Sequence, residues 1–252
     1  MKIARRTFLS SAALGGGFLL SGCDRLGANE DFRKLLSLGE DANFAVHRSL
    51  QSRMALAREF SPEHLSPKFR ENGTRRPPGA AYDAHEASNF ADWKVSVEGL
   101  VDRPQSFSME TLRTMPARTQ ITRHDCVEGW SAIGKWTGVP LKQLLDAAGV
   151  KSQARYVVFH CADMMNAEAP YYESVDMVDA YHPQTILAWS LNDKPLTIGN
   201  GAPIRLRVER QLGYKHAKYV ERIQVVDDLT KINGGKGGFW EDHSGYEWYG
   251  GI

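Results

Sequence analysis

The sequence predicts an α+β domain with mixed sheets, short helices and much irregular chain, on three observations. Segments with the alternation or the short apolar runs typical of strands outnumber the helical ones, and the helical ones are short. Strands and helices do not alternate regularly, so a parallel sheet built from βαβ units is not expected. The 252 residues, less the N-terminal segments described below, leave one domain as the main body.

Composition and charge argue against one class of function, nucleic-acid binding, and exclude few others. The chain is 42% hydrophobic and 24% charged, as ordinary globular proteins are, and its formal net charge is +1. A nearly neutral chain gives no reason to expect a nucleic-acid partner. Any basic site must therefore be local.

The segment 1–23 is predicted to be an export signal. A charged start leads into a weakly apolar run from Phe8 to Leu20, which is too short and glycine-rich for a membrane span, and the run ends at Cys23. The letters RRTFL resemble the twin-arginine signal, which exports proteins that are already folded. The letters LSGC resemble the bacterial lipobox, whose cysteine is acylated. We therefore expect a periplasmic protein, loaded with a cofactor before export and lipid-anchored at Cys23.

Residues 24–66 are predicted to form a linker and a helical arm. Apolar and aromatic side chains recur there at steps of three or four residues, and Ser61-Pro62 would end the helix. The following letters, SPKFRENGTRRPPGAAYDAH, are rich in proline, glycine and arginine and predict an irregular lead-in. The main domain is expected to cover 67–252.

The first half of this domain contains one predicted strand and two predicted helices. The letters KVSVEGLV at 94–101 alternate as in a half-buried strand. A short helix is expected at 108–115, where Pro116 would stop it. At 140–150 the leucines of PLKQLLDAAGV fall on one helical face, with proline at the entry and Gly149 at the exit.

The second half is dominated by predicted strands. RYVVFHCA at 155–162 is a short apolar run that carries Cys161 near its end, and PIRLRVE at 203–209 alternates between apolar residues and arginines. KYVERIQVV at 218–226 is the last predicted strand. The aromatic, glycine-rich tail at 231–252 is expected to pack on the domain, with some rings at the rim of a pocket.

The stretch RHDCVEGW at 123–130 contains the first candidate for chemistry, Cys126. The cysteine follows charged and titratable residues, whereas a structural cysteine is usually surrounded by apolar ones. Nearby cations would lower the thiol pKa and favour the thiolate. The residues alone leave three interpretations open: a structural thiol, a nucleophile with His124 or His160 as its base, or a metal ligand. A single thiolate suffices for a metal only where a cofactor supplies most other ligands.

Four segments of the chain carry a resemblance to a known family. RHDCVEGWSAIGKWTGVPL is similar to the cysteine segment of the sulfite oxidase superfamily of molybdopterin enzymes. NGAPIRL, LGYKHAK and the shorter FRENG resemble three further segments of that family. The resemblance extends from about Asn72 to Val226 and implies a sulfite oxidase-type molybdopterin-binding fold with a molybdenum-molybdopterin cofactor.

The resemblance also implies the roles of individual residues. Cys126 would be the catalytic metal ligand, because its soft thiolate suits a metal whose other sulfur ligands come from the pterin dithiolene. Cys161 stands where relatives have a small polar residue beside the cofactor, so it is a cofactor-binding candidate whose role stays open. The remaining residues expected to bind the pterin are Asn72, Asn200, Arg205, His216, Ala217 and Lys218.

The implied activity is that of a monomeric bacterial oxidoreductase that moves an oxygen atom and two electrons. We expect reduction of S-oxides or N-oxides, on small molecules or on proteins, with electrons from a haem- or quinone-linked partner in the membrane or periplasm. One alternative is a sulfite dehydrogenase, which would need Arg123, Arg207 and Lys215 to converge on a dianion. Another alternative is a lipoprotein that keeps the fold as a binding module without turnover.

Overall fold

The computed structural model describes residues 27–166 and 169–252, so the predicted export signal, with Cys23, lies outside the described residues. The chain divides into two compact units, Met1–Gln51 and Ser52–Ile252. The second unit contains all the segments that carry the family resemblance. The division predicted from the sequence, with boundaries at 23/24 and 66/67, stays a prediction.

Among its described residues, the first unit contains the helix α2 (Glu30–Leu50). The Asn29 side chain accepts a hydrogen bond from Phe32 N at 3.0 Å and caps the helix start. We expected the helix to continue to Ser61-Pro62, which is wrong. In the second unit Glu59 pairs with Thr122 as a β-bridge, and such pairing overrides a weak helical pattern. No helix among the described residues is both long and apolar enough to cross a membrane.

The second unit contains two five-stranded sheets, of which the first has the order β2-β1-β10-β5-β6. The strands β1 and β10, which are its first and last in the sequence, pair in parallel. Its other pairs are antiparallel, so the sheet is mixed. Three of its strands were expected from the sequence. The strands of this sheet are β1 (Lys94–Gly99), β2 (Gln105–Ser108), β5 (Tyr156–Asn166), β6 (Ala169–Asp176) and β10 (Val220–Val226).

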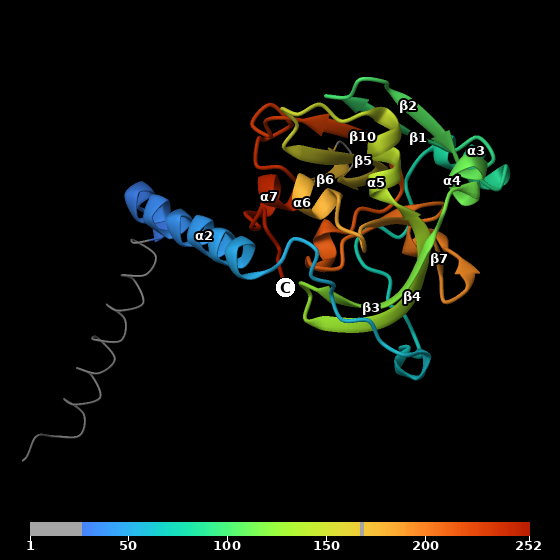
Figure 1. Cartoon of the computed structure of the whole chain (residues 1–252), viewed down its shortest axis with the longest axis horizontal. Helices are drawn as coiled ribbons and strands as arrows, with labels where there is room; N and C mark the ends of the chain where they lie inside the picture. The colour runs from blue at the N-terminus through green and yellow to red at the C-terminus, as the bar shows by residue number, and fades with distance from the viewer. Residues whose placement is uncertain (1–26, 167–168) are drawn as a thin grey trace, which may run out of the picture. The chain divides into compact units, whose positions relative to one another are not determined.

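The second sheet is built on a long hairpin that sequence patterns did not reveal. Its path is β3-β4-β7-β8, and β9 also pairs with β7. Figure 1 shows β3 and β4 curving together along the side of this unit that lies away from β10 and β5. The strands of this sheet are β3 (Arg118–Cys126), β4 (Trp130–Pro140), β7 (Ile186–Leu191), β8 (Lys194–Pro195) and β9 (Arg205–Arg207).

Short helices connect the strands, and both helices predicted in this domain are present. The Ser108 hydroxyl accepts from Thr111 N at 3.1 Å and starts α4. Gly149 ends α5 with φ +72°, in the left-handed region that favours glycine. The helices of this unit are α3 (Ala80–Ala87), α4 (Met109–Thr114), α5 (Leu141–Ala148), α6 (Met177–Ala180) and α7 (Phe239–Ser244), and the 3-10 turns are η1 (Pro62–His64), η2 (Ile198–Asn200) and η3 (Gly213–Lys215).

Two apolar cores lie on opposite faces of β9. Leu206 belongs to the larger core, which the first sheet and α5 line with side chains such as Val157 and Leu144. Arg205 and Arg207 point the other way, toward the smaller core around Trp136. The predicted alternation of β9 and the α+β class are therefore confirmed, and two arginines are buried against the smaller core, on the face of β9 away from the larger core.

Candidate functional site

Cys126 is placed by the tip of the β3–β4 hairpin. It is the last residue of β3 and pairs with Trp130, the first residue of β4, across a three-residue turn. Gly129 closes that turn with φ +83° and donates its backbone N–H to the Cys126 carbonyl at 3.0 Å. The hairpin thus carries the thiol to its end, where the Cys126 side chain meets a cavity and is 8% exposed.

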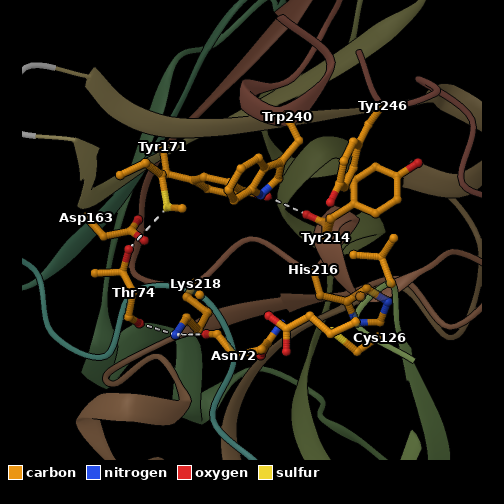
Figure 2. A pocket seen from close by; sticks show the side chains of 15 residues that line it. Asn72, Thr74, Cys126, Asp163, Tyr171, Tyr214, His216, Lys218, Trp240 and Tyr246 are labelled. Atoms are coloured by element: carbon orange, nitrogen blue, oxygen red, sulfur yellow. Dashed lines mark hydrogen bonds between the residues drawn. The ribbon is translucent and has the colours of Figure 1, made fainter. Parts of the chain in front are cut away.

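The cavity beside Cys126 gathers residues from five separate parts of the chain. With the open solvent at its mouth included, the space measures about 660 Å³. Figure 2 shows Cys126 and His216 at one end, Asp163 at the other, and Asn72 and Lys218 along the floor. The residues that line it are Asn72, Gly73, Thr74, Cys126, Val127, Glu128, Asp163, Met165, Tyr171, Gly213, Tyr214, His216, Lys218, Trp240 and Tyr246.

The Cys126 thiol is held protonated in the free protein, contrary to the sequence expectation. Burial raises the pKa of Cys126, and the Glu128 carboxylate adds to that effect, while a backbone hydrogen bond opposes it. Arg123 lies on the other face of β3, where it pairs with Asp125 at 2.9 Å. His124 lies on the same face as the thiol but is neutral, as shown next. Neither residue supplies a cation to the sulfur.

Beneath the thiol, His124 is fixed by a buried arginine. Arg207 Nη1 lies 2.9 Å from His124 Nδ1, and since an arginine can only donate, His124 Nδ1 accepts. Arg207 also donates to both carboxylate oxygens of Glu209, at 2.9 and 2.6 Å, and lies over the Trp136 ring at 4.3 Å. Burial and the charge of Arg207 lower the pKa of His124, so the imidazole stays neutral.

Lys218 is a clamp between two segments that the resemblance assigns to the pterin. Its Nζ donates to the carbonyl oxygens of Asn72 at 2.7 Å and Gly199 at 3.0 Å, and also to that of Thr74. These three bonds use all the donors of the ammonium group. Burial lowers the pKa of Lys218. Lys218 therefore joins the Asn72 segment to η2.

Arg205 ties η2 to the segment after η3 in a similar way. Its Nη1 donates to the Asn200 carbonyl at 3.0 Å, and its Nη2 donates to the His216 carbonyl at 3.2 Å. The guanidinium lies over the face of Trp136 at 5.2 Å. Burial, with Arg207 nearby, lowers the pKa of Arg205 to about 9. The residues predicted to bind the pterin are thus connected to one another through backbone carbonyls.

Several polar atoms of these residues are buried without a hydrogen-bond partner. They are Asn72 Oδ1, Asp163 Oδ1, Asn200 Oδ1, Arg205 Nε and His216 Nδ1. His216 Nε2 donates to the Gln211 carbonyl at 3.0 Å, so its Nδ1 is left as an acceptor. Buried polar groups normally find partners, and a pterin carries ring N–H groups, an amino group and a carbonyl that could pair with these atoms. The residues present therefore fit a molybdopterin beside Cys126.

The structure brings only part of the predicted residue set to the cavity wall. Asn72, Cys126, His216 and Lys218 line it. Asn200 and Arg205 lie directly behind the wall, bound to its members as described above. Ala217 and Cys161 belong to the larger apolar core, where Cys161 is a free thiol whose pKa is raised by burial. Their direct contact with a cofactor stays a prediction.

Asp163 is the main site residue that sequence reasoning missed. Its side chain is 2% exposed in the cavity wall, with Oδ1 unpartnered, and burial raises its pKa although Lys218 opposes the shift. The available signal was an acidic residue directly after the apolar letters RYVVFHCA at 155–162, because an aspartate is rarely buried unless it has a partner. Thr74 and Met165, which are joined by a hydrogen bond at 3.2 Å, also line the cavity without a sequence signal.

Comparison with known proteins shows which family the chain is similar to. The family model of the oxidoreductase molybdopterin binding domain matches residues 82–231. A protein of Azospira oryzae with the provisional name protein-methionine-sulfoxide reductase subunit YedZ1 is 39% identical, and the match covers 98% of this chain and 88% of that protein. The protein-methionine-sulfoxide reductase catalytic subunit MsrP of Xanthomonas campestris is 37% identical over 59% of this chain, but the match spans 49% of its own length.

Among solved structures, the sulfane dehydrogenase SoxCD from Paracoccus pantotrophus is similar over 55% of this chain and 39% of that one, at 25% identity and a TM-score of 0.49. The family model covers more than half of the 252 residues and includes Cys126 and the NGAPIRL and LGYKHAK segments. The Azospira relative extends the match to nearly the whole chain. The chain therefore belongs to the family of oxidoreductases with a molybdopterin-binding domain.

Proposed function

We propose that this protein reduces organic S-oxides at the cell envelope. In the net reaction the sulfur–oxygen bond breaks, the sulfur gains two electrons and becomes a thioether, and the oxygen leaves as water with two protons. The electrons would come from a haem- or quinone-linked redox partner. The relatives' names support this proposal, because the Azospira and Xanthomonas proteins are both named for methionine-sulfoxide reduction.

The family's cofactor, molybdenum-molybdopterin, supplies the two-electron redox chemistry when it is bound. The chain's own residues position it. Cys126 would hold the metal from the hairpin tip, and the unpartnered atoms of Asn72, Asp163 and His216 would pair with the pterin. Within the described residues, His, Cys, Asp and Glu side chains do not gather in threes at any place that could hold a metal ion.

The observation that carries the proposed substrate class is the state of the cations near the cavity. Arg207 and Lys215 are 0% exposed and paired with carboxylates, at 2.6 Å to Glu209 and 2.7 Å to Glu241 respectively. Arg123, the third cation that a sulfite dehydrogenase would need, pairs with Asp125 on the far face of β3. A dianion would meet no uncompensated charge on these three side chains, whereas a neutral S-oxide needs none.

The two basic residues in the cavity wall, Lys218 and His216, also favour a neutral substrate. Lys218 already donates to three carbonyl oxygens. Burial lowers the pKa of His216 well below its usual value, so its imidazole is neutral near pH 7. The cavity wall therefore favours a neutral substrate over sulfite.

The place of action rests on the sequence of the leader. The RRTFL and LSGC motifs at its start and end support export of the folded protein to the periplasm and acylation of Cys23. A lipid anchor would hold a monomeric catalytic unit near a membrane electron donor. Radiolabelled palmitate should enter the wild-type protein and not a Cys23→Ser variant, and equal labelling of both would contradict the anchor.

The experiment that tests the activity compares three substrates on metal-loaded protein. We expect a reduced viologen dye to be oxidised with methionine sulfoxide, with trimethylamine N-oxide as a second acceptor, and an oxidised dye not to be reduced with sulfite. Turnover with sulfite alone would establish the opposite direction. A native preparation that is stable, free of molybdenum and inactive on all three would instead support a binding module.

A further inference from the structure

The C-terminal segment forms one wall of the cavity. Trp240 in α7 and Tyr246 just after it both line the cavity, together with Tyr214 from η3. Figure 2 shows these three rings grouped on one side, across the space from Asn72 and Lys218. The wall is thus aromatic and the opposite floor is polar.

The three rings pack as one unit. Trp240 and Tyr246 are stacked, with centroids 5.7 Å apart and planes inclined by 23°. Tyr214 meets Tyr246 edge-on at 5.2 Å and 81°. The Tyr246 backbone N–H donates to the Trp240 carbonyl at 3.3 Å, which fixes the spacing of the stacked pair. We call Trp240, Tyr214 and Tyr246 the aromatic wall.

Two of the three rings of the aromatic wall lie on the exposed side of the cavity, whereas Tyr214 is buried. Trp240 and Tyr246 are both partly exposed, and Val127, the residue after Cys126, is 47% exposed at the same cavity. The unpartnered polar atoms of Asn72, Asp163 and His216 are instead buried. A molecule that arrives from solvent therefore meets the rings and Val127 before it reaches the thiol.

The wall is held rigidly. Glu241, next to Trp240, accepts a hydrogen bond from Lys215 Nζ at 2.7 Å, and Lys215 also pairs with Glu173 of β6. Lys215 adjoins Tyr214 in the sequence, so this buried cluster fixes both sides of the wall. Tyr214 Oη donates to the Glu247 carbonyl at 2.6 Å. These contacts describe a fixed recognition surface and not a movable lid.

We propose that the aromatic wall binds the alkyl and sulfinyl end of an organic S-oxide and so determines which substrates reach Cys126. This inference rests on the proposed function and adds its specificity determinant. A sulfoxide is neutral and carries a polarised sulfur flanked by C–H groups, and both features are attracted to the faces of aromatic rings. Inorganic oxyanions lack the alkyl groups and would be repelled by the same faces.

The test uses the metal-loaded protein and three variants. We expect Trp240→Ala and Tyr246→Ala each to raise KM for a peptide containing methionine sulfoxide by about 10-fold, the product of several lost ring contacts. We expect kcat and the molybdenum content per protein to change by less than about twofold. The reason is that neither ring belongs to the buried polar residues that would bind the pterin. Tyr246→Phe keeps the ring and should keep KM within twofold of wild type.

An unchanged KM in both alanine variants, with normal molybdenum content, would overturn the proposal. Loss of molybdenum together with activity would also overturn it, because it would assign the rings to cofactor binding. Circular dichroism and melting temperature serve as the folding control, since both rings are partly exposed and their removal should leave the fold intact.

A binding measurement separates this inference from the proposed function. Calorimetric titration of the oxidised, metal-loaded protein with the methionine-sulfoxide peptide involves no turnover. Weaker binding to Trp240→Ala than to wild type would support the aromatic wall even if no S-oxide were ever reduced. Equal binding to both proteins, or no binding to wild type, would refute it whether or not the reduction assay succeeds.

Discussion

At the residue scale, Cys126 faces two opposing demands. Its buried position favours the neutral thiol, since desolvation raises its pKa, yet a metal ligand must be a thiolate. A bound metal cation would offset the desolvation, whereas an isolated thiolate at this place would not be stabilised. If Cys126 holds the metal, as the motif predicts, the thiolate at the hairpin tip would be stabilised by the charge of the cofactor and not by the protein.

Replacing this sulfur should separate chemistry from folding. We expect Cys126→Ser to lower activity by at least about 100-fold, since even residues that only support a metal ligand change affinity or activity by 10–100-fold. The melting temperature of the cofactor-free variant should stay within a few degrees of the cofactor-free wild type, because the two side chains differ little in volume. Metal analysis and thermal unfolding check both statements, and wild-type turnover by Cys126→Ser would exclude the metal-ligand role.

The residue scale also shows what sequence motifs can and cannot predict. The motif predicts that Cys126 is the metal ligand, and the cavity wall does contain Cys126. The predicted lowering of its pKa was wrong, because neighbours in the sequence of a strand point to opposite faces. Arg123 therefore faces away from the thiol, and His124, which shares its face, is kept neutral by burial and Arg207.

At the scale of elements, a buried ion cluster joins three segments far apart in the sequence. Lys215 in η3 pairs with Glu173 in β6 and with Glu241 in α7, and all three side chains are at most 1% exposed. The cluster carries two carboxylates for one ammonium. Burial raises the pKa of Glu173, so this carboxyl is the one suited to carry a proton.

The cluster should respond unequally to loss of its members. We expect Lys215→Met to destabilise the protein by about 3–5 kcal/mol, since it leaves buried acidic groups without a partner. Glu173→Gln should cost less, because it leaves one ammonium and one carboxylate that still match in charge. Urea unfolding of the two variants gives the comparison, and equal losses would contradict this account of the cluster.

The loop between α6 and β7 gives a pH dependence at the same scale. His182 Nε2 lies 3.0 Å from the Ala55 carbonyl and Nδ1 lies 3.2 Å from Gln184 N, so both nitrogens are engaged in the neutral form. Burial lowers the pKa of His182. The unfolded chain thus takes up a proton below about pH 6.5 that the folded chain resists, and stability is lost as pH falls from there.

The corresponding measurement compares unfolding free energies at pH 7.5 and pH 5.5. Other buried histidines add to the wild-type slope, so the contribution of His182 is the difference between wild type and His182→Asn. We expect wild type to lose more stability than the variant on acidification, by at most about 1.4 kcal/mol per pH unit. A variant with an equal or steeper loss would assign the acid sensitivity to other groups.

Elements with an apolar pattern could be predicted from the sequence, whereas the β3–β4 hairpin could not. β1, β5 and β10, together with α4 and α5, follow from apolar alternation or helical periodicity. In β3 the inward positions are Gln120, Thr122, His124 and Cys126, so a buried face there carries polar side chains. A pattern search for apolar alternation cannot detect a strand whose polar face is buried for function.

At the scale of the whole molecule, the buried arginines behind the site lie on β9, the strand that separates the two apolar cores. Arg205 and Arg207 are the side chains of this strand that face the smaller core, and they anchor η2 and the β3–β4 hairpin respectively. The motifs predicted that these segments would meet at a pterin. How these segments come together in the fold depends on pairing between strands that are not adjacent in the sequence, such as β7 with β9. No local sequence pattern specifies that pairing.

The cofactor should therefore act as part of the folded structure. Without it, buried polar atoms such as Asn72 Oδ1 and Asn200 Oδ1 have no hydrogen-bond partner, and such atoms reduce stability. Binding at 100 times the dissociation constant would add about 2.7 kcal/mol, which corresponds to a rise in melting temperature of about 5–10 °C for a domain of this size. We expect a difference of this size in melting temperature between metal-loaded protein and protein made in cells that cannot synthesise molybdopterin. Equal melting temperatures would mean that these atoms find their partners elsewhere and that the cavity is not shaped for the pterin.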